Sequence, residues 1–365
     1  LPAQRRLRSR SLMERSAHPR CGMDRRRSLA GMLWAGATGW LPLHPGWAEA
    51  APAPLPTDWP SLLRRIRDAS LRRSYSGTYV VNAGGAISSS RIVHSADGRH
   101  VVERIESLDG QMRHIYRQDD AVHVFLPRTR EVTVEQHDAF GGFPSLPGGP
   151  VAAPAQLGEL YELQAAGEDR VAGHDAQVWT LRPRDSYRYA QRLWLERSSG
   201  LLLRTDTLGP RGETLESAAF SELTLDNAPS AAGLLQEMRR LEGYRVRKAS
   251  HQRTDLEQEG WWLRSLPPGF VMLRCVRRPL RSAAPEDSVT TALGPATESS
   301  GVVQAVFGDG LTSVSLFMEP DAGTPRRETP LSWGATQALS RRIGNAWVTV
   351  VGDVPLVTLK FQAAD

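Results

Sequence analysis

Residues 76–110 read SGTYVVNAGGAISSSRIVHSADGRHVVERIESLDG, and the repeated pattern in this stretch decides the fold class. Short runs rich in Val, Ile, Thr and Tyr are separated by Gly-containing turns at residues 82–85, 97–98 and 109–110. Strands at this short, regular spacing, with Asp-Gly turns between them, are typical of an antiparallel meander. We therefore expect a sheet of sequential hairpins with one buried face.

The same pattern continues on both sides of a loop rich in Gly and Pro at residues 140–150. An amphipathic helix is expected at residues 59–73 and a short helix at residues 156–165. If the strands form a sheet that curves over these helices, the fold is α+β, with a large, half-open antiparallel β-barrel over residues 57–225. The further strands are expected at residues 113–117, 121–126, 131–135, 170–182, 189–196, 200–208 and 213–225.

A sheet that curves without closing encloses a cavity lined by its apolar face, and such a cavity suits acyl chains. The alternative, for each of these residues taken one at a time, is that it is an ordinary core residue and lines no cavity. The residues expected to line the cavity are Tyr79, Val81, Ile92, Val124, Leu126, Val178, Trp194, Leu202 and Phe220.

From residue 226 the strand pattern weakens, and residues 226–258 are interpreted as a linker with a helical turn near residues 234–241. Residues 259–365 are expected to form a smaller α+β domain. Its expected elements are a strand around Cys275, a mobile polar loop at 280–300, a hairpin at 302–307 and 311–319, a helix at 334–343, a strand at 346–352 and a strand or helix at 355–361.

The composition of the 365-residue chain, 40% hydrophobic and 23% charged, is that of a globular protein with two or three domains. Its formal net charge is +5. Residues 1–50 hold nine Arg against three acidic residues, which leaves 36 basic and 37 acidic residues in the rest of the chain. The basic character belongs to the first fifty residues, so the composition gives no support for nucleic-acid binding.

Those fifty residues have the three parts of an export signal. Three Arg at residues 25–27 precede an uncharged, largely apolar run at 28–41, and Ala48-Glu49-Ala50 is a small-x-small cleavage pattern. Residues 23–50 are interpreted as a signal peptide cleaved near Ala50. Residues 1–22 precede Met23, a natural start, and are interpreted as a mis-start extension.

A membrane anchor is the alternative interpretation of this segment. Pro42 and Pro45 interrupt the apolar run well short of the roughly 20 residues that a membrane span needs. The mature product is therefore expected outside the cytoplasm, exported by the general or by the twin-arginine route.

Local signatures of catalysis such as G-x-S-x-G, H-E-x-x-H, a Walker loop or a dinucleotide-binding glycine fingerprint do not occur. We expect no catalytic residue, no cofactor and no metal, and a binding protein rather than an enzyme. His94, His100, His114 and His123 fall on or beside strands, where a metal site is the alternative to scattered surface histidines. Cys275 is the single cysteine after residue 50, and it is expected to be a buried core thiol.

Several segments, taken in order, resemble the RseB/MucB family of periplasmic regulators, and they cover roughly residues 57–360. In the larger block they are YSGTYV (75–80), SRIVH (90–94), ESLDG (106–110), VAGHDAQV (171–178), RPRDSYRY (182–189), RLWLE (192–196) and GLLL (200–203). In the smaller block they are DGLTSVSLF (309–317), RRIG (341–344) and VTVVGDVP (348–355).

The resemblance implies a negative regulator of the envelope-stress factor sigma-E, located in the periplasm. Its larger domain resembles the open barrels of lipoprotein carriers. Such a protein binds the periplasmic region of a membrane-spanning anti-sigma factor and shields it from proteolysis. Lipopolysaccharide or lipoprotein acyl chains in the cavity would release the partner, because a ligand that favours the non-binding state weakens partner affinity.

The resemblance places partner contacts mainly in the smaller domain and at the domain junction. One departure from the family is Phe307-Gly308, where a Tyr-Ser-like pair is expected. A homodimer is left open. So is a second function, a lipid or lipoprotein carrier without an anti-sigma partner, although a simple carrier does not need the smaller domain. The expected partner-binding residues are Trp261, Trp262, Leu311, Phe317, Met318, Arg341 and Arg342.

Overall fold

The computed structural model describes residues 58–97, 101–118, 121–136, 154–248, 251–279, 301–321, 323, 328, 330–360 and 363–364. These residues belong to one compact unit, residues 51–365. Four predicted segments lie outside the described residues: the extension at 1–22, the signal peptide at 23–50, the Gly/Pro-rich loop at 140–150 and the polar loop at 280–300.

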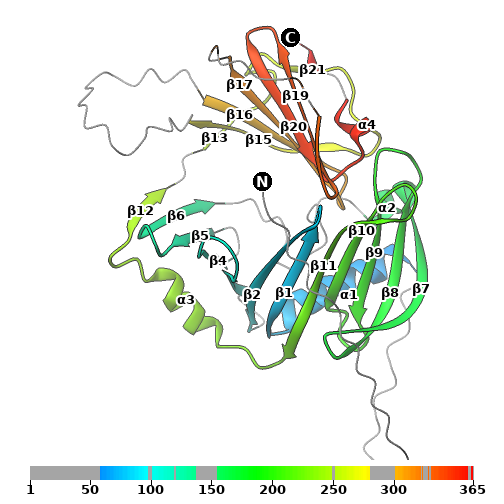
Figure 1. The fold of residues 1–365 in the computed structure, drawn as a ribbon, viewed down its shortest axis with the longest axis vertical. Coiled ribbons are helices and arrows are strands. Elements are labelled where there is room, and N and C mark those ends of the chain that lie inside the picture. The colour runs from blue at the N-terminus through cyan, green and yellow to red at the C-terminus, as the bar shows by residue number, and fades with distance from the viewer. Residues whose placement is uncertain are drawn as a thin grey trace, which may run out of the picture. The chain divides into compact units, whose positions relative to one another are not determined.

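The first helix, α1 (Trp59–Arg72), ends within one residue of its predicted boundary (Figure 1). Asp58 caps it by accepting a hydrogen bond from the Ser61 N–H at 2.8 Å, and a proline lies in its first turn. Trp59, Leu62, Ile66 and Ala69 are buried at spacings of three and four residues, which confirms the predicted apolar face.

Twelve strands form one large sheet in the order β12-β6-β5-β4-β3-β2-β1-β11-β10-β9-β8-β7. All neighbours pair antiparallel except β12 and β6, which pair in parallel. Because β12 and β7 are edges, the sheet is open, as predicted, and does not close into a barrel. The strands are β1 (Tyr75–Ala83), β2 (Ala86–Ala96), β3 (Val101–Ser107), β4 (His114–Gln118), β5 (Ala121–Leu126), β6 (Glu131–Gln136), β7 (Tyr161–Val171), β8 (His174–Pro183), β9 (Ala190–Glu196), β10 (Leu202–Leu208), β11 (Thr214–Leu225) and β12 (Arg245–Lys248).

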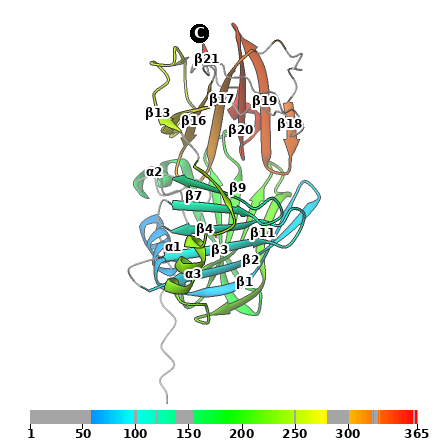
Figure 2. The same cartoon turned by 90° about the vertical axis from the view of Figure 1, so that its left-hand side faces the viewer.

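The large sheet consists of two meanders joined by the pairing of β1 with β11, whose register places Tyr75 opposite Leu225 (Figures 1 and 2). Within each meander, every strand pairs with the next one in sequence. We call β7–β11 the packed half and β2–β6 with β12 the thin half.

The packed half is buried on both faces. α1 and α2 (Pro154–Leu160) cover one face, where they pack on Trp179, Leu193 and other apolar side chains. The other face buries Val178 and Trp194 in a second cluster. The predicted helix at 156–165 is wrong in its second part, because Tyr161 begins β7 and pairs with β8 opposite Pro183.

The stretch predicted to be a linker contains α3 (Ala231–Arg239) and β12. Ser230 caps α3 by accepting a hydrogen bond from the Gly233 N–H at 3.2 Å. The helix buries Leu234 and Met238 against the thin half, and β12 then extends that half at its edge. Residues 231–248 are therefore part of the large sheet and its cover.

A second sheet has seven strands in the order β13-β15-β16-β17-β20-β19-β18, and its core holds Cys275, as predicted. Burial raises the pKa of this thiol to about 11. The strands are β13 (Gln252–Arg253), β15 (Val271–Pro279), β16 (Gly301–Gly308), β17 (Ser313–Pro320), β18 (Pro330–Trp333), β19 (Thr336–Ile343) and β20 (Ala346–Gly352). A two-stranded pair, β14 (Trp262–Leu263) and β21 (Ala363–Ala364), and a short helix, α4 (Leu356–Leu359), complete this region.

The helix predicted at residues 334–343 is wrong, because this segment is the tip of a hairpin followed by β19. Leu339 and Ile343 both pack against the core of the second sheet. Their spacing of four residues fits one face of a strand as well as one face of a helix, so periodicity did not separate the two. Within the described residues this region is mostly β, with α4 in place of the predicted longer helix.

Candidate functional site

The inner face of the large sheet, on which Tyr79 lies, gathers apolar side chains at the middle of the sheet. Phe220 lies opposite Tyr79, and the two rings pack edge to face with centroids 5.0 Å apart. The predicted lining residues in this cluster are all buried except the half-buried Val81, so this part of the predicted cavity lining is packed as a core. Although the strand register places Val178 and Trp194 on the face of Val80, six of the nine predicted lining residues belong to this cluster: Tyr79, Val81, Ile92, Val178, Trp194 and Phe220.

The other three predicted lining residues lie apart from this cluster. Leu202 is buried in a separate cluster, beneath α1 and α2. Val124 and Leu126 are half-buried on β5, in the thin half.

A row of apolar side chains crosses the thin half on the inner face. The register places Ile92, Ile105, Ile115 and Val124 next to one another on β2, β3, β4 and β5. Ile92 is buried, whereas the other three are half-buried. We call Ile105, Ile115 and Val124 the inner strip. Sequence reasoning missed Ile105 and Ile115, because only the strand register shows that they continue the row of Val124.

Polar groups fix Trp194 at the border of the central cluster. Its indole N–H donates to Asp169 Oδ2 at 2.9 Å, which lowers the pKa of that carboxyl. Arg204 lies over the indole ring, 4.4 Å from its centroid, and donates two hydrogen bonds to Asp206. These charges pair with one another, so their role is to hold the indole in place.

His94 forms a buried pair with Glu103 on the inner face. Its Nδ1 lies 2.9 Å from Glu103 Oε1, and its Nε2 lies 2.8 Å from the carbonyl oxygen of Ser70 in α1. A carbonyl only accepts, so Nε2 carries a proton, and a second proton lies between the ring and the carboxylate. The pair ties the end of α1 to β2 and β3.

The remaining histidines do not join this pair. His123 lies on the face toward α3, with Nδ1 3.0 Å from the Met238 carbonyl oxygen, and His114 pairs across the sheet with Phe125 on that same face. His100 lies outside the described residues. In the part of the chain that the structure describes, no group of three or more His, Cys, Asp or Glu side chains is placed to hold a metal ion.

Arg188, in the loop between β8 and β9, is the centre of a contact between the two sheets. Its side chain is fully buried and donates hydrogen bonds to Asp309 and Asp185 and to the Pro268 carbonyl. The Tyr161 hydroxyl donates to the same Asp309 at 2.8 Å. Burial, together with the Asp309 charge, raises the pKa of Tyr161 well above its ordinary value. We call these side chains the Arg188 junction.

Asp309 also organises its own turn, because its other oxygen accepts the N–H groups of Leu311 and Thr312 at 2.9 Å. This turn directs Leu311 into the core beneath α1 and α2, where it is fully buried. The structure therefore places Leu311, predicted to touch a partner, between the two sheets.

A second contact joins the tips of two hairpins, and glycine is required there. A Cβ on Gly84, in the β1–β2 turn, would lie 2.2 Å from Cδ1 of Trp333. A Cβ on Gly334 would lie 3.0 Å from the Gly84 nitrogen, and both glycines have positive φ, +55° and +60°. Trp333 nevertheless remains 59% exposed.

The predicted partner-binding residues are spread over the second sheet. Phe317 and Arg342 lie on its outer face, because their cross-strand partners are Thr349 and Trp347. Met318 points into the core on the opposite face. The remaining three differ in exposure: Trp261 and Arg341 are half-buried, and Trp262 is 53% exposed.

A cavity of about 410 Å³ opens beside the core of the second sheet, and two of the predicted residues, Trp261 and Met318, line it. Charged groups lie at its wall, where Arg277 pairs with Glu259.

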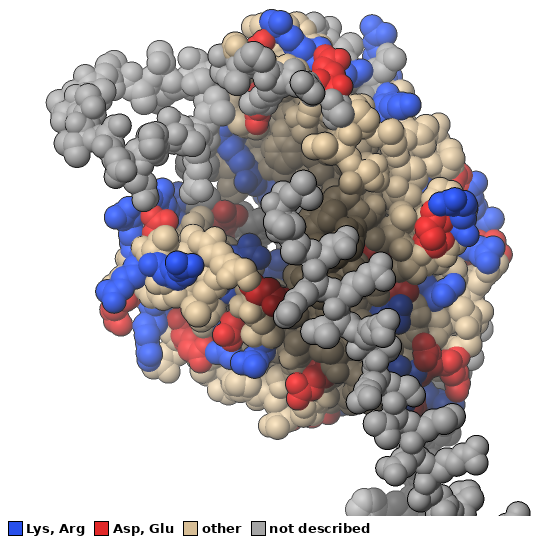
Figure 3. All heavy atoms as spheres, viewed as in Figure 1, with Lys and Arg blue, Asp and Glu red and all other residues tan. Residues whose placement is uncertain are grey.

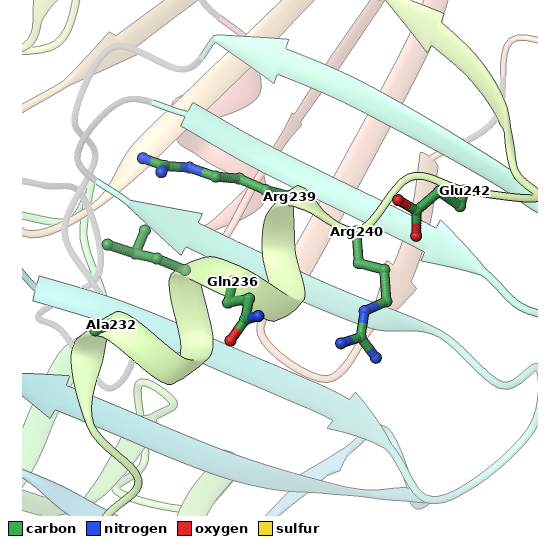
Figure 4. Close-up of a pocket in the computed structure, with 6 residues that line it drawn as sticks. Ala232, Gln236, Arg239, Arg240 and Glu242 are labelled. Carbon is green, nitrogen blue, oxygen red and sulfur yellow. The ribbon is translucent and has the colours of Figure 1, made fainter.

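A groove of about 530 Å³ runs along α3, in the stretch that sequence reasoning assigned to a linker. Figure 4 shows the Arg239 and Arg240 side chains leaving the end of α3 in different directions, with Glu242 beyond them. In Figure 3, Lys and Arg side chains gather on the lobe where Figure 1 places α3 and β12. The residues that line the groove are Ala232, Leu235, Gln236, Arg239, Arg240 and Glu242.

The helices of the described residues include none that is both long enough and apolar enough to cross a membrane. The inner strip, the second sheet and the α3 groove offer binding surfaces, whereas the Arg188 junction is buried.

Comparison with known proteins matches residues 58–243 to the MucB/RseB N-terminal domain and residues 255–365 to the MucB/RseB C-terminal domain. The chain is 32% identical to the sigma factor AlgU regulatory protein MucB of Pseudomonas aeruginosa, over 85% of this chain and 90% of that relative. It is 25% identical to the sigma-E factor regulatory protein RseB of Haemophilus influenzae, over 82% of this chain and 87% of that relative. Among solved structures, MucB in complex with MucA(peri) is similar, with a TM-score of 0.59, 29% identity and coverage of 83% of this chain and 96% of that one.

Proposed function

The chain belongs to the MucB/RseB family, and from this premise we propose that it binds the periplasmic region of a membrane-spanning anti-sigma factor and thereby restrains an envelope-stress sigma factor. The observation that carries the proposal is the presence of both family domains in one chain that covers most of a MucB solved with MucA(peri). The Arg188 junction supports it, since a partner that spans both domains needs them held in a fixed arrangement.

Binding would shield the anti-sigma factor from the protease that starts its degradation. The exposed candidates for this contact are Trp262 and Arg342, because Leu311 and Met318 are buried. Aromatic and Arg side chains are the usual anchors of protein interfaces. The mature protein would act in the periplasm after cleavage near Ala50, as a binding protein rather than an enzyme.

Acyl chains of lipopolysaccharide or lipoproteins would bind at the inner strip. Tyr79 and Phe220 already fill the middle of the sheet, whereas Ile105, Ile115 and Val124 leave apolar surface half-exposed. A lipid that binds better to the partner-free state lowers partner affinity by the ratio of its affinities for the two states.

Partner binding is tested with the full protein and the periplasmic region of the anti-sigma factor encoded in the same genome. We expect Trp262→Ser with Arg342→Glu to weaken the complex at least about tenfold in a pull-down and in protease-protection assays. Leu108→Ser with Arg113→Glu also replaces an exposed apolar side chain by Ser and an exposed Arg by Glu, at sites of the thin half, and serves as the control. No capture of the region by the unsubstituted protein would refute anti-sigma binding.

Lipid release is tested by adding lipopolysaccharide to the preformed complex. Val124→Asp should abolish release, because a charge on the inner strip opposes acyl-chain burial. Val80→Asp, on the opposite face of the sheet and equally half-buried, is the matched control. If lipid binds the protein tightly while no anti-sigma region does, the chain is a lipid or lipoprotein carrier instead.

A further inference from the structure

The edge strand β12 is open to a further strand. It pairs with β6 on one side, and no described strand lies on its other side. All four of its residues are exposed, including Val246 at 42%. An exposed strand edge is a template for another strand.

The backbone of β12 presents hydrogen-bonding groups at this outer edge. The Arg245 N–H donates to the Arg130 carbonyl at 2.7 Å, so the main-chain groups of Arg245 point toward β6. Backbone groups alternate in direction along a strand, so those of Val246 and Lys248 point outward. A short extended peptide therefore finds at least two outward-facing residues to pair with.

Positive charge surrounds this edge. Residues 239–248 hold Arg239, Arg240, Arg245, Arg247 and Lys248 against a single acidic residue, Glu242. Glu131 pairs with both Arg245 and Arg247. By contrast, neither Arg239 nor Arg240, at the wall of the α3 groove, pairs with any described residue. These two unneutralised guanidinium groups, six and five residues before β12 in the chain, favour carboxylates in the incoming segment.

We propose that an extended acidic peptide segment adds to β12 as a thirteenth strand of the large sheet, with carboxylates against Arg239 and Arg240. Main-chain hydrogen bonds supply the affinity and the two Arg supply the selectivity, as in other cases of strand addition. The inference rests on the proposed function in one respect: the segment belongs to the anti-sigma partner. It goes beyond that function by assigning part of the partner to the thin half of the large sheet.

The competing explanation is that the charges at β12 prevent self-association of the sheet edge. Two synthetic ten-residue probes distinguish the explanations with the full protein. One alternates Glu with Val and Thr, and the other has Lys in place of every Glu. A third probe carries the Glu sequence with N-methyl groups on alternate residues, which removes the main-chain donors that face β12.

Fluorescence anisotropy should show binding of the Glu probe, and at least about tenfold weaker binding of the Lys and N-methyl probes. Arg239→Glu with Arg240→Glu should also weaken the Glu probe at least about tenfold, whereas Arg64→Glu with Arg67→Glu, at exposed positions of α1, should leave it unchanged. Equal binding of the Glu and N-methyl probes, or no effect of the Arg239/Arg240 change, overturns the inference. Binding of anionic phospholipid vesicles at this edge without binding of the Glu probe also overturns it, in favour of a lipid surface.

The same variants separate this inference from the proposed function. If the unsubstituted protein and the Arg239/Arg240 variant capture the anti-sigma region equally well, β12 is not part of that contact and the proposed function stands. If the unsubstituted protein binds the Glu probe but not the anti-sigma region, the edge binds acidic peptides and the proposed partner is wrong.

Discussion

The packed half of the large sheet buries side chains on both faces, whereas the thin half buries them mainly beneath the nine-residue α3. Leu181, Leu193 and Leu195 of the packed half are fully buried. In the thin half, the inner strip stays half-buried and β12 stays exposed. One continuous sheet thus combines a part that is buried on both faces and anchored to the second sheet with a part whose surface stays partly exposed. Each of the following substitutions tests that difference, beginning with the largest expected effect.

Replacing Arg188 by Met should cost about 3–5 kcal/mol of the free energy of unfolding, because it leaves Asp309 buried without its cation. Chemical denaturation measures the loss. Arg182→Met, at an exposed position of β8, is the control and should stay within about 0.5 kcal/mol of the unsubstituted protein. A loss below about 1 kcal/mol for Arg188→Met would show that the junction does not anchor the packed half.

Leu193→Ala in the packed half should cost about 3 kcal/mol, because the side chain is fully buried and its removal leaves a cavity. Ile115→Ala in the thin half should cost about 1 kcal/mol, since Ile115 is already partly exposed. The pair is compared by urea denaturation under the same conditions. Equal losses would remove the distinction between the two halves.

Met238→Ala should cost about 2 kcal/mol and act on the thin half alone. Met238 packs with Tyr116, Phe125 and Val132, so its loss loosens α3 from β4, β5 and β6. Hydrogen exchange should rise in the amides of these strands and stay unchanged in β8 and β9. Faster exchange throughout the sheet would mean that the two halves open together.

Glu216→Gln is expected to have the smallest effect, about 0.5 kcal/mol, and the effect should depend on pH. Burial, followed by the charge of Asp353, raises the pKa of Glu216 on β11 in the folded protein. Its contribution therefore favours folding below the unfolded-state pKa and is lost as pH rises through the folded-state pKa. The variant should be more stable than the unsubstituted protein near pH 7 and equal to it near pH 4, as measured by thermal denaturation. A gain that persists at pH 4 would contradict this cause.

The parts of the fold that follow from local pattern could be predicted from the sequence. The hairpins between residues 75 and 126 and α1 have turn and capping residues at the right spacing. β12 could not be recognised, because Arg-Val-Arg-Lys has no apolar face and becomes a strand only by pairing with β6. The spacing of Leu339 and Ile343 also fits a helix, and their segment is a strand because it pairs with β20.

The candidate site was predictable to a smaller extent. Alternation identified Val124 as inward-facing, but joining it to Ile105 and Ile115 requires the strand register. The Arg188 junction requires still more, because Arg188 and Asp309 are 121 residues apart and neither lies in a local motif. These features form when side chains that are far apart in the sequence pack together, and a single sequence does not show which distant residues will meet.

The pairings at the two ends of the thin half also set an order of folding. The hairpins within each meander join neighbouring segments and close quickly, whereas β1–β11 joins Tyr75 to Leu225 and β6–β12 joins Glu131 to Arg245. Contacts of such long sequence separation form late, because the loop-closure entropy must be overcome first. While the chain folds, it therefore carries an unpaired β6 edge until β12 has paired with it, and an unpaired strand edge exposes a partly folded chain to association with other chains.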